Sequence, residues 1–148
     1  MTYRLYFLVG MIALSSSAFG CSCTKPVMTL DEEIQSAFSS AAAVVKAEAI
    51  EVTEDEYVPT PNNPPPLSRE QRVTWQVSRV WKGSYASNSL IKSVTEVQCC
   101  ICGVAVKKGA VYVLFLDDQM PFWLSICSNS KPVEQAAPDM ALLDRLSQ

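Results

Sequence analysis

The stretch VTWQVSRVWKG, from Val73 to Gly83, decides the fold class. Apolar and polar residues alternate in it, and the apolar positions include Val73, Trp75 and Val77. Alternation with a period of two is typical of a strand with one buried face. Gly83 interrupts the pattern, so we expect a half-buried strand that ends at about Lys82.

Four other segments have strand character, and we expect strands at Ala43–Val52, Leu90–Val97, Ala110–Leu116 and Phe122–Cys127. The segment AVYVLFL (Ala110–Leu116) is almost entirely apolar, which indicates a strand that is buried on both faces. Between the first two strands lies VPTPNNPPPLSRE, with five prolines between Pro59 and Pro66. Proline cannot pair inside a sheet, so we expect an exposed, stiff loop here.

Two helices are expected, one on either side of the strands. Thr29 and Glu32 have the spacing of a capping box, in which each side chain binds the backbone of the other residue. The apolar positions that follow share one helical face, and they are Leu30, Ile34, Ala37 and Phe38. We expect this helix to end near Ser39–Ser40, and a short second helix to begin at Pro138–Asp139.

The order of these elements indicates a mainly β protein. There is no alternation of strands and helices, so a parallel sheet is not favoured. Five short strands favour a five-stranded, OB-like Greek-key barrel with flanking N- and C-terminal helices. An OB barrel commonly binds oligonucleotides, but the net charge of −3 and the lack of a basic cluster argue against nucleic acid as a partner.

The first twenty residues resemble a secretory signal peptide. The apolar run Leu5–Leu14 is followed by SSSAFG, with small residues at the cleavage positions. Cleavage after Gly20 would make Cys21 the first residue of a single domain, residues 21–148. We therefore expect a secreted, extracellular protein, or a periplasmic or cell-envelope one in a bacterium. A short membrane anchor is the alternative for the apolar run.

The sequence has six cysteines and no histidine. The cysteines are Cys21, Cys23, Cys99, Cys100, Cys102 and Cys127. An even number in an exported chain indicates a disulfide framework, although spacing alone does not choose the pairing. A thiolate site for a soft metal is the alternative. Without histidine, the usual general base and zinc ligand are absent, so we expect neither an enzyme nor a cofactor of its own.

The sequence around these cysteines resembles a known family. CSCTKP (Cys21–Pro26) at the mature N-terminus is similar to the start of the tissue inhibitors of metalloproteinases and their netrin-like relatives. Further similarities follow in the same order as in the family, at Ala37–Phe38, Val44–Ile50, Val73–Gly83, Cys102–Gly103, Gly109-x-x-Tyr112-x-x-Phe115 and Leu124–Ser128. The resemblance extends from Cys21 to about Pro132 and implies a single-domain form with an OB-like barrel.

The resemblance also implies a disulfide pairing, Cys21 with Cys102 and Cys23 with Cys127. These two bonds would hold the N-terminal segment against the barrel. The sequence departs from the family in two places. Ser39 stands where the animal inhibitors have a third framework cysteine, and Cys99 and Cys100 have no counterpart, so their pairing stays open.

In the family, the first residue chelates the catalytic zinc of a target protease through its α-amino nitrogen and carbonyl oxygen. The resemblance assigns this role to Cys21, with Ser22 entering the specificity pocket of the protease. Residues along the cleft would be Cys23, Thr24, Lys25 and Pro26. The implied partner is a zinc metalloprotease.

Two other functions remain as alternatives. One is a netrin-like module that binds another extracellular protein without inhibiting it. The other is a membrane-anchored lipoprotein, since Ala18–Cys21 weakly resembles a lipidation motif. Lipid on Cys21 would occupy its sulfur and commonly its nitrogen, and would remove both the disulfide and the chelate.

Overall fold

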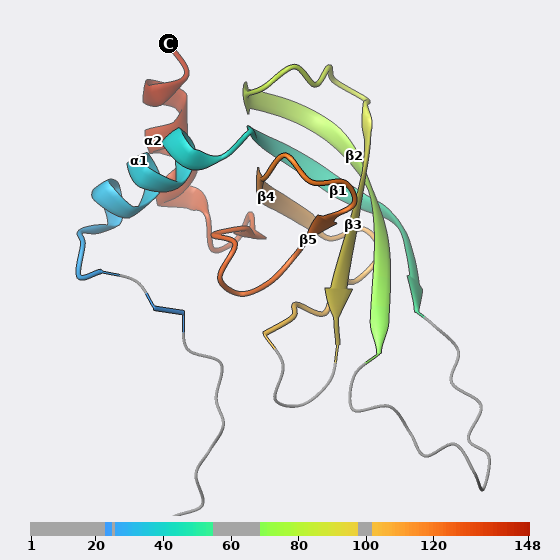
Figure 1. Cartoon of the computed structure of the whole chain (residues 1–148). Coiled ribbons are helices and arrows are strands. Elements are labelled where there is room, and N and C mark those ends of the chain that lie inside the picture. Colours follow the sequence, from blue (N-terminus) through green and yellow to red (C-terminus); the bar gives the residue numbers. More distant parts are fainter. Residues whose placement is uncertain (1–22, 25, 55–68, 98–101) are drawn as a thin grey trace, which may run out of the picture.

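The computed structural model describes residues 23–24, 26–54, 69–97 and 102–148. These residues form a curled six-stranded mixed sheet with two helices on one side (Figure 1). The strand order is β5-β3-β2-β1-β4-β6. The elements are α1 (Leu30–Ser40), β1 (Ala43–Glu54), β2 (Glu70–Lys82), β3 (Leu90–Glu96), β4 (Val111–Leu116), β5 (Phe122–Trp123), β6 (Lys131–Pro132) and α2 (Ala137–Leu146).

The mainly β class and the two flanking helices are confirmed, but the number of strands is corrected from five to six. Neighbouring strands are antiparallel except β3 and β5, which are parallel. The predicted strand at Phe122–Cys127 ends after Trp123. A turn follows, in which the Ser128 N–H donates to the Ser125 carbonyl (3.1 Å) and the Cys127 N–H to the Ser125 hydroxyl (3.2 Å).

The missed strand, β6, has only two residues, and the second is Pro132. Proline lacks an N–H group, so in sheets it is confined to edges and ends. β6 is such an edge, because it pairs only with β4. A strand this short has no periodic pattern, and the sequence therefore gives no signal for it.

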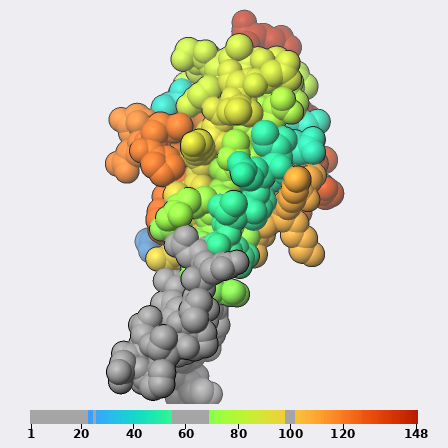
Figure 2. Space-filling model, turned by 90° about the vertical axis from the view of Figure 1, so that its right-hand side faces the viewer, coloured from blue at the N-terminus to red at the C-terminus, as the bar shows by residue number. Residues whose placement is uncertain are grey.

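Two apolar clusters lie on opposite faces of the sheet. The first draws on β1 to β5 and includes Trp75, Ile91 and Leu114. The second lies between the sheet and the helices and includes Ile34, Trp81 and Leu143. Figure 2 shows a side of the molecule formed by β1, β2 and β3, with the 105–110 region and the segment before β5 at its two margins.

β4 contributes to both clusters. Tyr112, Leu114 and Leu116 lie in the first, and Val113 and Phe115 lie in the second. The expected burial on both faces is thus confirmed for this strand. Because side chains alternate across a strand, only an apolar residue at nearly every position can satisfy two cores at once.

The first helix starts and ends on specific side-chain bonds. The predicted capping box is present, since the Thr29 N–H donates to Glu32 Oε2 (2.8 Å) and the Glu32 N–H to Thr29 Oγ1 (3.3 Å). At the other end, Lys82 Nζ donates to the carbonyls of Phe38 (2.8 Å) and Ser39 (2.9 Å). This places a positive charge at the negative end of the helix dipole and joins α1 to β2.

The second helix is fixed by a buried carboxylate in its first turn. Asp139 is 1% exposed, and its Oδ2 lies 2.8 Å from Lys131 Nζ. This ion pair joins β6 to α2 and gives the buried carboxylate a positive partner. Pro138 stands at the start of the helix, as the sequence predicts. Within the described residues, no helix is long and apolar enough to cross a membrane.

Several predicted features lie outside the described residues. They are the signal peptide (1–20), Cys21, Ser22, Lys25, the proline-rich loop at Pro59–Pro66, and Cys99 and Cys100.

Candidate functional site

A disulfide fastens the N-terminal segment to the body of the protein. Cys23 and Cys127 are bonded, with Cα atoms 5.5 Å apart and 104 positions apart in the sequence. This is one of the two bonds that the family resemblance implies. We call residues 23–24 and 26–29 the anchored segment, which leads into α1 (Figure 1).

Cys102 lies in the chain segment next to this disulfide. The Ile126 N–H donates to the Cys102 carbonyl (2.9 Å), and Gly103 forms a β-bridge with Ser125. Cys102 is itself disulfide-bonded. The predicted partner, Cys21, lies outside the part of the chain that the structure describes. The fold therefore brings two of the predicted framework positions, Cys102 and Cys127, to one end of the sheet.

The segment after Cys102 is held against the sheet by close backbone contact and by side-chain bonds. A Cβ atom on Gly103 would lie 1.6 Å from the Glu96 carbonyl oxygen, so only glycine fits here. The Val104 N–H donates to the buried Thr95 hydroxyl (2.8 Å). Farther on, the Val106 N–H donates to the Gln71 side chain (2.8 Å). These contacts give the disulfide-bonded end of the molecule a rigid base.

The anchored segment exposes most of its side chains. Thr24 and Pro26 are exposed, and Val27 and Met28 are exposed apolar side chains. Ile126, the neighbour of Cys127, is 47% exposed. Single exposed apolar side chains are common on protein surfaces, and these three lie close in the sequence to the two cysteines of the Cys23–Cys127 disulfide.

The start of α1 sets where the anchored segment ends. Two hydrogen bonds from Thr29 lower the pKa of Glu32 from its ordinary value of 4.5. The bond from the backbone N–H has the larger effect, and the bond from the hydroxyl has the smaller. The carboxylate is thus held ionised next to the positive end of the helix dipole. The chain direction after residue 29 is fixed by this cap, and the direction before it by the Cys23–Cys127 bond.

A depression of about 490 Å³ lies beside Ile126, the neighbour of Cys127, with Glu33, Val104 and Tyr112 also in its lining. Burial raises the pKa of Tyr112 above its ordinary value of 10.0, and the charge of Glu134 raises it further. Tyr112 is therefore a neutral phenol at physiological pH.

The described residues include no group of three or more Cys, Asp or Glu side chains that could hold a metal ion. Of the residues that the family resemblance assigns to protease contact, Cys23, Thr24 and Pro26 lie together in the anchored segment. The sequence did not indicate that Ile126 is exposed, because its segment was expected to be a strand. Its position next to Cys127 was the available signal.

Comparison of the sequence with protein-family models and with curated proteins finds no match.

Proposed function

We propose that the protein is secreted and inhibits zinc metalloendopeptidases, with Cys21 as the zinc-chelating residue. The observation that carries the proposal is the Cys23–Cys127 disulfide, which fixes the segment next to Cys21 and leaves Thr24 and Pro26 exposed. A short, rigid and exposed segment is the shape that enters an extended protease cleft.

The chemistry of the proposal depends on the free amine of Cys21. A catalytic zinc keeps one position open for water or substrate. The amine nitrogen and carbonyl oxygen of one residue can replace that water as a five-membered chelate. The ordinary pKa of an α-amine is about 8, so a zinc ion readily displaces its proton.

The disulfides would contribute by pre-ordering the segment. A chain held in its bound conformation loses less entropy on binding. Cys102 supports the proposed Cys21–Cys102 bond, because it is disulfide-bonded and its carbonyl accepts from Ile126, next to Cys127. Two bonds would then fix both cysteines of the sequence CSC.

Protease contacts would come from Ser22, Cys23, Thr24, Lys25 and Pro26. Ser22 would fill the specificity pocket and the others would follow the cleft. Val27 and Ile126 would add apolar contact at the rim.

The proposed fold family is the OB-like barrel of the netrin-like domains. The sheet order supports it, since the antiparallel strands lie in the order β4-β1-β2-β3, which is the spatial order 4-1-2-3 of a Greek key.

The test is to add one alanine before Cys21. This converts the amine into an amide, which is a much poorer zinc ligand. Because each 1.4 kcal/mol is about a tenfold change in Kd, we expect inhibition of secreted zinc endopeptidases to fall by orders of magnitude. The fold should survive, since the change is at a terminus. The assay is a titration of a panel of such proteases with the native and the extended protein.

Ser22→Gly is the matched variant, because it alters pocket filling and keeps the amine. It should change which proteases are inhibited without abolishing inhibition. Equal inhibition by the native and the extended protein would overturn the chelation mechanism. N-terminal analysis and intact mass should show a free Cys21 amine, and a lipid there would replace the proposal with membrane anchoring.

The second candidate is a netrin-like module that binds an extracellular protein without inhibiting it. The exposed apolar side chains of Val27, Met28 and Ile126 favour a contact surface of this kind and require no chelation. This function becomes the better account if no protease in the panel is inhibited at micromolar concentration.

A further inference from the structure

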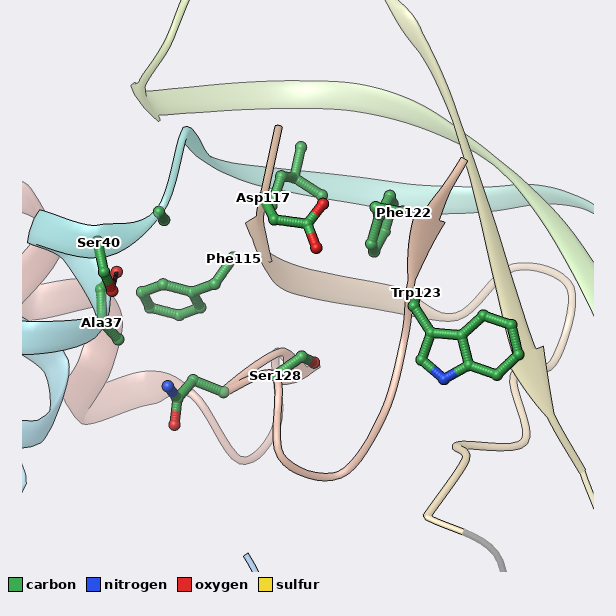
Figure 3. A pocket seen from close by; sticks show the side chains of 10 residues that line it. Ala37, Ser40, Phe115, Asp117, Phe122, Trp123 and Ser128 are labelled. Atoms are coloured by element: carbon green, nitrogen blue, oxygen red, sulfur yellow. Dashed lines mark hydrogen bonds between the residues drawn. The ribbon is translucent and has the colours of Figure 1, made fainter. Parts of the chain in front are cut away.

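A pocket of about 190 Å³ opens between the end of α1, the end of β4 and β5, and it plays no part in the proposed inhibition. Its lining includes Ala37, Ser40, Phe115, Asp117, Phe122 and Trp123. In Figure 3, the Asp117 side chain lies between Phe115 on one side and Phe122 and Trp123 on the other. The volume of the pocket suits one side chain rather than a large ligand.

The apolar part of the pocket is aromatic. Phe115 and Phe122 are buried to 7% and 1% exposure, and their positions are set by the two apolar clusters. Trp123 is 48% exposed, because it points away from the sheet face on which Phe122 is buried. An indole exposed in this way on an edge strand is accessible to a ligand.

The polar part of the pocket is negative. Asp117 is exposed, and its Oδ1 accepts a hydrogen bond from the Gln119 N–H (3.0 Å). The last turn of α1 contains no basic residue, and its carbonyl end lies at Ser40. Lys82 offsets part of that negative end, but it does not line the pocket. Within the described residues, no cationic side chain lines it.

We propose that this pocket binds an arginine side chain presented by a partner protein. A guanidinium group stacks on aromatic faces and also donates to a carboxylate through two parallel N–H groups. The Trp123 ring and the Asp117 carboxylate supply these two partners. The apolar stem of the arginine would lie against the pocket wall, to which Phe115 and Ala37 contribute. Lysine has a compact, strongly hydrated charge that uses the aromatic wall less well.

The test uses two probes of the same shape, N-acetyl-arginine N-methylamide and the neutral citrulline analogue. Binding is followed through the Trp123 indole N–H resonance in a ¹⁵N-labelled protein. The other two indoles are assigned by their hydrogen bonds to Ser93 and Asp144. We expect the arginine probe to shift the Trp123 resonance with saturation, and the citrulline probe to bind at least about tenfold more weakly, because it has no charge.

Matched variants locate the interaction. Asp117→Asn should weaken arginine binding about fivefold or more, whereas Asp118→Asn should change it less than about twofold, since it alters the net charge equally but does not line the pocket. Trp123→Leu should abolish binding. Because this variant lacks the reporting indole, the titration is followed through the amide resonance of Gln119. Thermal unfolding checks that each variant folds.

Four results would overturn the proposal. Two concern the probes: the citrulline probe binds as tightly as the arginine probe, or the corresponding lysine probe binds more tightly. The third is an equal effect of Asp117→Asn and Asp118→Asn on arginine binding. The fourth is that the Trp123 resonance shows no saturable shift when the arginine probe is raised to 50 times a concentration of about 1 mM. None of them depends on Cys21, so failure here is separate from failure of the proposed inhibition.

Discussion

At the scale of single residues, Gly103 helps to position the disulfide-bonded end. The backbone of Glu96 occupies the space that a side chain at this position would need. The contact lets the chain return beside β3, so that Thr95 can bind Val104. Cys102 is thereby brought next to the segment that contains Cys127.

Gly103→Ala should strongly destabilise the protein. The added Cβ would lie 1.6 Å from the Glu96 carbonyl oxygen, so backbone atoms must move. We expect the free energy of unfolding to fall by about 3 kcal/mol or more, measured by urea denaturation.

Gly109→Ala is the control, because its Cβ would meet no atom within 4 Å and only its φ of +84° opposes the change. Its cost should be about 1–2 kcal/mol. Equal losses for the two variants would contradict the role given to the Glu96 contact.

At the scale of elements, α1 depends on local signals that are readable in the sequence. Thr29 and Glu32 form the reciprocal cap that their spacing predicts. Thr29→Ala should lower the free energy of unfolding by about 1 kcal/mol, since an orphan N–H loses its acceptor. Thr24→Ala, a change at an exposed threonine before the helix, should leave unfolding unchanged. Thermal and urea unfolding measure both, and equal losses would count against the cap.

The same cap predicts a pH dependence. The pKa of Glu32 is lowered in the folded state, so its stabilising effect is complete above the ordinary value of 4.5 and is lost as the pH falls through the lowered folded value. Unfolding followed across this acidic range should show a smaller pH dependence for Glu32→Gln than for the native protein. An unchanged dependence would contradict the bond to Thr29.

Local patterns predicted α1, α2 and the four longest strands because each has its own period or cap. The predicted end of β5 was wrong, because hydrogen bonds to Ser125 form a turn where the apolar sequence predicted a continuing strand. The Cys23–Cys127 bond followed only from the family resemblance, because spacing does not determine pairing. The aromatic pocket could not be predicted, since Ala37, Asp117 and Trp123 come from separate elements that meet only in the fold.

At the scale of the whole molecule, β1 and β4 form a wall between two cores. Val44 packs toward the helices, whereas Val45 packs into the other cluster. The Cys23–Cys127 disulfide then closes a chain segment that contains α1 and the strands β1 to β5. The sheet and the disulfide therefore stabilise the fold in different ways, one by burial and the other by restricting the unfolded chain.

Replacing Cys23 and Cys127 together with serine should lower the free energy of unfolding by about 3–5 kcal/mol, because a long closed loop is opened in the unfolded state. The folded sheet should persist, as both clusters are intact, so circular dichroism should match that of the native protein. Cys23→Ser alone would leave the Cys127 thiol free to react, so the double variant is the better test. No loss of stability in the double variant would contradict the entropic role of the bond.

The distance of 104 positions between Cys23 and Cys127 also has a consequence during synthesis. A ribosome adds about 5–20 residues per second, so roughly 5–20 s separate the appearance of the two thiols. Cys99, Cys100 and Cys102 are made within that interval, so they are available to Cys23 before Cys127 exists. An early oxidant would trap such premature pairs, and only thiol–disulfide exchange converts them to the native bond. If the protein is secreted as proposed, the yield of correctly bonded protein should therefore depend on an isomerase as well as on an oxidant.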